Sequence, residues 1–356
     1  MTRLTADAGA MTGSGASPAE APEPARAWRR ALGLTAGLGA LLVTVVGSVL
    51  IGSQELSVPE VWNALATAGD TQAHFIVNDL RIPRTVVGLA VGIALGIAGA
   101  LIQALTRNPL ADPGILGVNA GAAFFVALGV SVFGVSSIGG YVWFAFAGAL
   151  VVTVAVYLIG SAGRGGADPV QLTLAGVALG AVLSGVVTAM VLLDSQTFNQ
   201  MRSWNAGSIV SRGWDILLPV LPFLAVGLVL AGVAVGALNS IALGDDLARA
   251  LGTNITRTRV LVIIAVTLLA GGATAIAGPI GFVGLMVPHI ARWIVGPDQR
   301  WILAYTLVLA PALVLAADIL GRIVIRPAEF PVGIVTAFIG APVLILLVRR
   351  KRASGL

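Results

Sequence analysis

Residues 81–117 read RIPRTVVGLAVGIALGIAGALIQALTRNPLADPGILG, and this stretch decides the fold. Two arginines bracket a proline, and a glycine-rich apolar segment of membrane-spanning length follows. That segment ends in a polar break before the next proline begins a second apolar run. Regularly spaced glycines let neighbouring membrane helices approach closely, and irregular backbone at the membrane boundary needs protein or a water-filled cavity around it. The stretch therefore predicts a packed, multi-helix membrane domain and not a simple anchor.

The composition of the whole chain points to the same class of protein. Of its 356 residues, 57% are hydrophobic and only 10% are charged, whereas soluble domains carry about 25% charged residues. We therefore predict an all-α polytopic membrane protein with about ten transmembrane helices. The expected spans lie near residues 31–51, 84–105, 114–133, 141–161, 171–193, 214–237, 258–277, 280–295, 301–317 and 332–348, with the eighth and ninth short.

The segments outside the spans set the domain organisation and topology. Residues 1–28 are expected to form a disordered cytoplasmic tail, and 29–356 a single transmembrane domain. A short amphipathic helix is expected within 52–80. With both termini inside, fifteen of the 21 Lys and Arg residues fall on the cytoplasmic side, as the positive-inside rule requires. The break at 108–113 has a counterpart at 278–288, which suggests an inverted repeat of the two halves.

Several classes of function are excluded by what the chain lacks. It has no cysteine and only two histidines, His74 and His289, which argues against a metal site. Lys351 is the only lysine and lies in a basic C-terminal run, so the chain has no Walker-type ATP site of its own. The scattered arginines give no nucleic-acid patch, and no nucleophile–base cluster indicates a membrane enzyme with catalytic residues. An ion-coupled secondary transporter would need ionisable residues within its spans, and the predicted spans are nearly free of them.

Arginines on the expected outer side form the first candidate site. Arg81 and Arg84 flank Pro83, which suits the first turn of a helix, so we expect both to project at the outer surface. Arg322 follows Asp318 by four residues, which allows the two to pair on one helix face. From the residues alone, these arginines could equally extend along the membrane surface and bind lipid phosphates. Arg326 has no assigned role.

Polar stretches on the expected inner side form the second candidate site. Residues 238–259, LNSIALGDDLARALGTNITRTR, are the longest polar insertion, with apolar residues at helical spacing. An amphipathic connector lying on the membrane would show the same pattern. Asn108 and Leu110 lie in the polar break, where Asn108 could simply cap a turn before Pro109. Gln103 could line a pathway or pair across helices.

Three motifs resemble the FecCD-type family, the permease subunits of ABC importers for iron-siderophores, haem and vitamin B12. They are RxPR followed by GxxxQxxxRNPLAxPxxLG, GPIGFVGLMVPHIAR at 278–292, and ADILGRIVIRPAEFPVGIVTAFIGAP at 317–342. The resemblance implies a type II importer architecture in the cytoplasmic (inner) membrane. It also implies a second permease chain in a homo- or heterodimer, two ABC ATPase subunits that bind ATP with Mg, and an extracytoplasmic substrate-binding protein. The implied cargo is a ferric siderophore, with haem or cobalamin as alternatives.

The resemblance also assigns roles to individual residues. It implies that Arg81, Arg84 and Arg322 dock the binding protein, and that Asn108, Leu110 and Gln103 belong to the gate or pathway. A coupling segment within 238–257 would contact the ATPase through Gly244, Asp245, Asp246, Leu247, Ala248, Arg249, Ala250, Leu251 and Gly252. A second gate is expected at residues 165–170, but this loop lacks the small hydroxyl residues of the family. His289 is expected to be structural, and Asp194 a boundary residue.

Overall fold

The computed structural model describes residues 23–162 and 169–353, and these residues form helices joined by short loops. The long and medium helices are α1 (Glu23–Leu50), α4 (Ile82–Thr106), α5 (Val118–Ser131), α6 (Ile138–Ser161), α7 (Pro169–Leu193), α8 (Ser195–Asn205), α9 (Trp214–Ile241), α11 (Ile255–Ala277), α12 (Val283–Val295), α13 (Gln299–Val324) and α14 (Val332–Ala353). The short ones are α2 (Val58–Ala66), α3 (Gln72–His74), the π-helix η1 (Phe75–Arg81), the 3₁₀ turn η2 (Pro113–Leu116) and α10 (Asp245–Ala250). Most of the predicted tail and the second-gate residues 165–168 lie outside the described residues.

The predicted spans are found at their expected places. Within the described ranges, seven helices are long and apolar enough to cross a membrane, and α5, α12 and the apolar part of α14 are shorter. Two boundaries were wrong. The ninth span, expected to be short, is the 26-residue helix α13, whereas the third begins at its expected place with η2 before α5. Helix α1 also starts at Glu23, inside the segment predicted to be a disordered tail.

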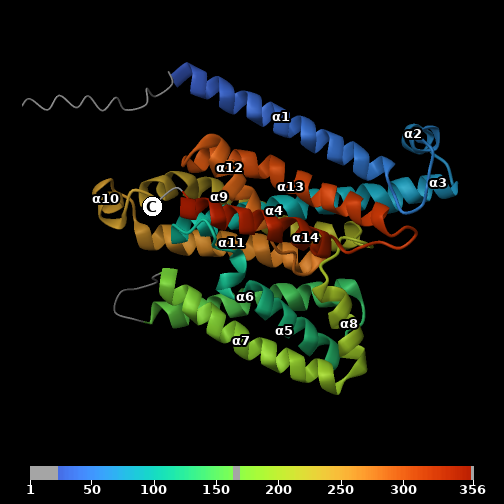
Figure 1. The fold of residues 1–356 in the computed structure, drawn as a ribbon. Helices are drawn as coiled ribbons and strands as arrows, with labels where there is room; N and C mark the ends of the chain where they lie inside the picture. The colour runs from blue at the N-terminus through green and yellow to red at the C-terminus, as the bar shows by residue number, and fades with distance from the viewer. Residues whose placement is uncertain (1–22, 163–168, 354–356) are drawn as a thin grey trace, which may run out of the picture.

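The helices form three layers (Figure 1). The central layer holds α4 together with α9 and α11 to α14, while α5 to α8 form a second layer on one side of it. Helix α1 lies along the opposite side and packs chiefly on α13. Helices α10 and α2 lie at opposite ends of the bundle, here called the α10 end and the α2 end. The described parts of both chain termini lie at the α10 end.

Helix α4 forms the centre of the core because its glycines admit other backbones. A Cβ on Gly99 would lie 1.8 Å from the carbonyl oxygen of Gly284, and one on Gly92 would lie 2.5 Å from Cα of Pro311. Such contacts are closer than any side chain tolerates, so only glycine lets α12 and α13 pack directly on α4. This confirms the close packing that the glycine spacing predicts.

The two predicted breaks are real, and each precedes a half-length helix. Arg107 adopts a left-handed conformation (φ 50°) after α4, and Phe282 (φ 68°) does so after α11. The following helices, α5 and α12, have 14 and 13 residues, or about 20 Å of length against a hydrocarbon core of about 30 Å. Each packs against the long helix of the other half: α12 against α4, and α5 against α11. This reciprocal arrangement supports the inverted repeat.

The connection after α7 contains a helix that the sequence reading missed. Helix α8 is polar on most of its surface, and Asp194 caps it by accepting hydrogen bonds from the backbone N–H groups of Gln196 and Thr197. Asp194 is thus the boundary residue expected at the end of α7 and carries a structural role. The predicted amphipathic helix within 52–80 is α2, whose first turn is closed by a Ser57–Glu60 capping box.

Candidate docking and coupling sites

A cluster of charges at the α2 end joins helices that are far apart in the sequence. The carboxylate of Asp318 on α13 accepts hydrogen bonds from Arg84 on α4 (2.6 Å from Nη2) and from Arg322 (3.0 Å from Nε). Glu329 accepts a further one from Nη1 of Arg84 at 2.6 Å. Arg322 also donates to the carbonyl oxygens of Ser48 and Ile51 at the end of α1. This cluster therefore connects α1, α4 and α13.

The side chains of the cluster are largely withdrawn from the surface. Arg322 and Asp318 are each 1% exposed, and Arg84 is 9% exposed. Arg81 is 4% exposed and donates to the carbonyl oxygens of Val49, Leu50 and Gln54. The expectation that Arg81 and Arg84 project at the outer surface is therefore wrong, whereas the predicted pairing of Asp318 with Arg322 is confirmed. Buried guanidinium groups require carboxylate or carbonyl partners, and those partners are too distant in sequence to be recognised there.

The three arginines nevertheless converge on one small cavity. It has a volume of about 120 Å³, and its lining includes Arg81, Arg84, Arg322 and Glu329. Burial alone would raise the pKa of Glu329. A hydrogen bond from Ser53 and the charges of Arg84 and Arg322 outweigh that effect, so the pKa lies below its usual value. Glu329 thus favours the carboxylate form and lines the same cavity as three cations, and the sequence reading did not single it out.

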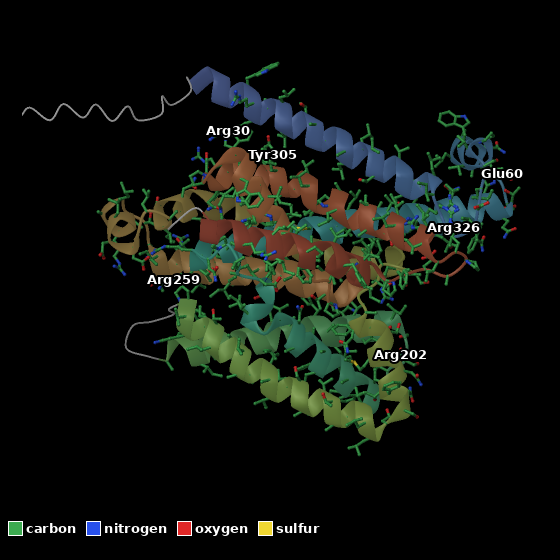
Figure 2. All side chains as sticks on the ribbon, viewed as in Figure 1. Arg30, Glu60, Arg202, Arg259, Tyr305 and Arg326 are labelled. Atoms are coloured by element: carbon green, nitrogen blue, oxygen red, sulfur yellow. The ribbon has the colours of Figure 1, made fainter. Side chains whose placement is uncertain are left out.

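A second charge cluster lies at the α10 end. Asp245, the first residue of α10, forms ion pairs with Arg107 at the end of α4 and with Arg259 on α11. The Arg259 pair spans 2.9 Å, and Arg259 marks this end of the bundle in Figure 2. Here the side chains stay accessible, with Arg107 41% and Asp245 28% exposed. Asp246 and Arg249 form a separate, fully solvated pair at 3.0 Å. Arg107 and Arg259 were not among the predicted site residues, because no local pattern links them to Asp245.

Helix α10 and the residues on either side of it present apolar side chains to the outside. Only Ala248 of this helix is buried, and it packs with Ile241 and Ile255. Leu243, Leu247 and Leu251 are 61%, 48% and 60% exposed. Gly244 (φ 110°) and Gly252 (φ 81°) bound the helix in conformations that other residues rarely adopt. The predicted segment 244–252 is thus a compact projection with an exposed leucine face.

The predicted gate residues occupy different surroundings. The Oδ1 atom of Asn108 accepts the backbone N–H of Leu110 at 3.0 Å, which is the turn cap expected before Pro109, and Leu110 is 39% exposed. Gln103, in contrast, is 1% exposed and donates to the carbonyl oxygens of Gly284 and Leu285 on α12. In this structure Gln103 therefore pairs across helices and does not line an open pathway.

The two histidines have structural surroundings. The ring of His289 packs edge-on against Trp293 at 5.0 Å, and the ring of His74 hydrogen-bonds to Thr71 at 2.7 Å. Among the described residues, no three His, Asp or Glu side chains are grouped so as to hold a metal ion.

Comparison with known proteins shows a family and a solved architecture that this chain is similar to. The FecCD transport family matches residues 40–350. The ferric enterobactin transport system permease protein FepD of Escherichia coli (strain K12) is 50% identical over 330 residues, covering 92% of this chain and 97% of FepD. A protein of Bacillus subtilis (strain 168) named "Probable siderophore transport system permease protein YfiZ" is 41% identical, covering 87% of this chain and 93% of YfiZ. A solved inward-facing metal-chelate type ABC transporter superposes with a TM-score of 0.78 at 30% identity, covering 89% of this chain and 98% of that one.

Proposed function

This chain belongs to the FecCD transport family, the permease subunits of ABC importers, and on that premise we propose that its cargo is a ferric siderophore. The ATP site of such an importer lies on a separate ATPase subunit. The observation that carries the cargo assignment is the 50% identity with a ferric enterobactin permease over nearly the full length of both chains. A shared fold alone does not fix a substrate, but identity at this level extends over 92% of this chain.

The character of the spans supports a large chelate as cargo. Helices α5, α6 and α7 contain no Asp, Glu, Lys, Arg or His. An ion-coupled transporter would need such groups as coupling sites, whereas a bulky, rigid metal chelate suits walls of small and apolar residues. This supports ATP-driven import over ion coupling.

Uptake in iron-starved cells tests the cargo directly. Deletion of the gene should abolish ATP-dependent uptake of one radiolabelled ferric siderophore, with catecholate, hydroxamate, citrate, haem and cobalamin supplied in separate arms. Re-expression of the intact chain should restore that uptake. Loss of haem or cobalamin uptake alone would overturn the siderophore assignment while leaving the importer mechanism in place.

We further propose that the α10 end faces the cytoplasm and that segment 244–252 binds the ATPase. The exposed face of Leu243, Leu247 and Leu251 supports this, because an amphipathic helix in a groove is a common mode of recognition. Leu247→Asp should release the ATPase during co-purification. Val58→Asp, at an exposed apolar position on α2, is the matched control. Retention of the ATPase by the Leu247 variant would contradict the proposal.

The ion pairs of Asp245 suggest how a movement of α10 would be transmitted to the gate residues Asn108 and Leu110. Arg107 directly precedes Asn108, so a displacement of α10 would act on the polar break through the Arg107–Asp245 ion pair. We propose that two permease copies enclose the pathway and that Asn108 and Leu110 narrow it at this end. Two ATPase subunits would drive the change between its open and closed forms.

At the α2 end we propose that the cavity of Arg81, Arg84 and Arg322 receives an acidic side chain of the binding protein. The convergence of three cations on one space supports this role, although they are buried in the free chain. In the free chain, Glu329 already forms an ion pair with Arg84 at this site. Docking would then exchange the carboxylate of Glu329 for one from the partner.

A further inference from the structure

A groove on the surface of the bundle lies apart from both charge clusters. It runs between α9 and α13 with α4 beneath it, and it has a volume of about 530 Å³. Its lining is apolar except for one charged residue, Arg300 in the first turn of α13; the other lining residues are Ile97, Leu228, Ala231, Gly232, Val235, Gly236, Leu303, Ala304 and Leu307.

Glycines create the room in this groove. A Cβ added to Gly232 or to Gly236 would meet no atom within 4 Å. The two residues are one helical turn apart, so they open the same face of α9. Larger side chains at these positions would fill the groove without displacing its walls.

The length of the groove matches one leaflet of a bilayer. From Leu228 to Gly236 the lining of α9 rises about 12 Å at about 1.5 Å per residue, and half of the hydrocarbon core is about 15 Å thick. Arg300 marks the end of the groove that lies at the α10 end of the bundle. A fatty acyl chain inserted from that leaflet would extend along the groove to Leu228 with its headgroup beside Arg300.

The guanidinium of Arg300 is available for a ligand. Among the residues whose side chains the structure describes, no hydrogen bond or ion pair joins it to another residue. The nearest acid in sequence, Asp298, is occupied: its Oδ1 atom accepts from Nδ2 of Asn239 and from the backbone N–H of Arg300. The Asn239–Asp298 bond also ties the end of α9 to the start of α13, which fixes the mouth of the groove.

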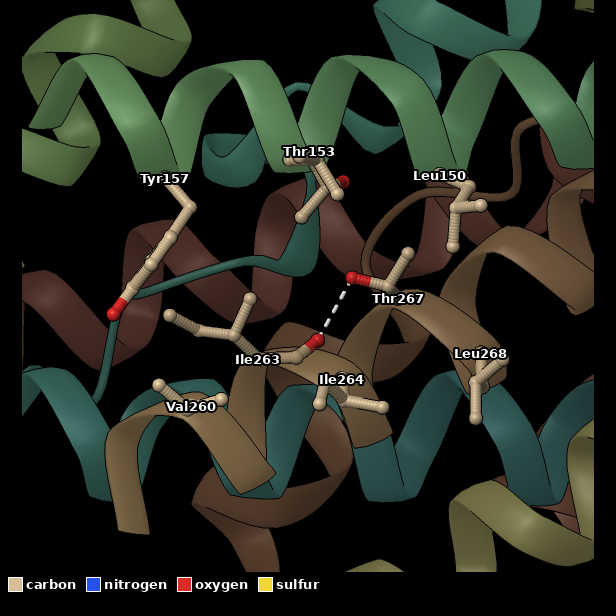
Figure 3. Close-up of a pocket in the computed structure, with 9 residues that line it drawn as sticks. Leu150, Thr153, Tyr157, Val260, Ile263, Ile264, Thr267 and Leu268 are labelled. Carbon is tan, nitrogen blue, oxygen red and sulfur yellow. Dashed lines mark hydrogen bonds between the residues drawn. The ribbon is translucent and has the colours of Figure 1, made fainter. Parts of the chain in front are cut away.

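A second apolar pocket shows what the charge adds. The pocket between α6 and α11, with a volume of about 210 Å³, is lined by Leu150, Thr153, Val154, Tyr157, Val260, Ile263, Ile264, Thr267 and Leu268 (Figure 3). It contains no charged side chain, and the hydroxyl of Thr267 donates to the carbonyl oxygen of Ile263. This pocket could hold a chain but offers no charge to a headgroup.

We propose that the α4–α9–α13 groove is a binding site for an anionic phospholipid with a single phosphate, of the phosphatidylglycerol type. The acyl chain covers Gly232 and Gly236, and the phosphate pairs with Arg300. One guanidinium suits one phosphate diester, and basic pockets between transmembrane helices bind anionic headgroups in this way. Phosphatidylethanolamine is disfavoured, because its ammonium group would lie beside the same cation.

The test is native mass spectrometry of the full-length permease–ATPase complex from nanodiscs holding equal amounts of phosphatidylglycerol and phosphatidylethanolamine. The wild type should retain phosphatidylglycerol in preference. Arg300→Gln should reduce that preference about fivefold, the contribution of one basic residue near an anionic surface. Gly236→Leu should remove the bound lipid of either kind. The Leu side chain enters open space and raises helix propensity, so this variant is expected to fold.

Two matched controls separate the groove from the general surface. Arg257→Gln changes an exposed arginine at the same end, and Gly39→Leu fills open space on α1; both should retain lipid as the wild type does. An unchanged preference in Arg300→Gln would overturn the proposal, as would equal losses in the controls. A third outcome is that Gly236→Leu alters the oligomeric state and leaves the lipid unchanged. The groove would then be an interface between copies, and the proposal would be wrong.

Discussion

The charge clusters at the two ends of the bundle use the same chemistry in opposite surroundings. At the α2 end, Asp318 is 1% exposed and lies between two arginines from different helices. At the α10 end, Asp245 also lies between two arginines from different helices, but its side chain is 28% exposed. The first carboxylate is therefore held in a low-dielectric environment, and the second is screened by solvent.

This difference in burial assigns the two ends different mechanical roles. Separating a buried ion pair leaves a charge without solvation, so the cluster at the α2 end holds α1, α4 and α13 together permanently. Separating an exposed pair costs little, because water replaces the partner. The ion pairs of Asp245 can thus separate at low cost, whereas those of Asp318 cannot.

The largest effect is expected from removal of the central carboxylate at the α2 end. Asp318→Asn should destabilise the folded protein by about 3–5 kcal/mol, because Arg84 and Arg322 would be left buried without a counter-charge. Thermal unfolding of the purified protein measures this change. Glu55→Gln, which removes the exposed Arg326–Glu55 pair, is the control and should change stability little; Arg326 is labelled at the α2 end in Figure 2. Equal stability of Asp318→Asn and the wild type would remove the contrast between the two ends.

A smaller effect is expected at Glu329, the accessible edge of the same cluster. Glu329→Gln should tighten binding of the substrate-binding protein about tenfold, because the variant removes a charge-assisted hydrogen bond that competes for Arg84. Surface plasmon resonance measures the affinity, with Glu55→Gln again as the control. Charge reversal of Arg81 and Arg84 would be a poorer test, since both are buried. Unchanged or weaker binding by Glu329→Gln would contradict the exchange of carboxylates.

The pH dependence of docking follows from the same group. The pKa of Glu329 is lowered from 4.5, so the carboxylate and its ion pair with Arg84 are fully present above that value and are lost only as the pH falls through the lowered pKa. Wild-type docking should therefore show no tightening due to Glu329 between pH 8 and about 5. If docking became tighter near pH 6 in the wild type but not in Glu329→Gln, the pKa of Glu329 would be raised and not lowered.

The smallest change in stability is expected from removal of the Asp245 charge at the α10 end. The main effect of this change should be on the coupling of ATP hydrolysis to transport. Asp245→Asn should alter the free energy of unfolding by less than about 1 kcal/mol, yet lower the amount of substrate moved per ATP about fivefold, because Arg107 loses its link to α10. Transport and ATP hydrolysis measured in the same proteoliposomes give this ratio. Asp246→Asn breaks only a solvated pair and is the control. Equal ratios in the two variants would contradict a role of Asp245 in coupling.

The sequence predicted the spans better than it predicted the contacts between them. Hydropathy and the glycine spacing of α4 depend on local composition, so the ten apolar helices and the two breaks could be located. The Asp318–Arg322 pair could be predicted for the same reason, because its members are four residues apart on one helix. Helix α8 was missed since its composition is polar and its start depends on one capping aspartate.

Contacts between distant segments could not be inferred in this way. Arg84 and Asp318 are separated by 234 positions, and Arg107 and Asp245 by 138. An arginine predicted to lie at a surface becomes buried once another helix supplies a carboxylate. The sequence around the arginine does not indicate that distant partner. The side chain of Gln103 likewise donates a hydrogen bond to the start of α12, 181 positions away in the sequence.

The half-length helices α5 and α12 also constrain how the chain enters the bilayer during synthesis. With 13 residues, α12 is too short to partition into lipid as an independent segment at the translocon. Its first-turn carbonyl groups, at Gly284 and Leu285, find donors on Gln103 of α4, which is synthesised much earlier. The carboxyl-terminal half is therefore expected to be integrated only after α4 is in place, so the amino-terminal half acts as an internal template for membrane insertion.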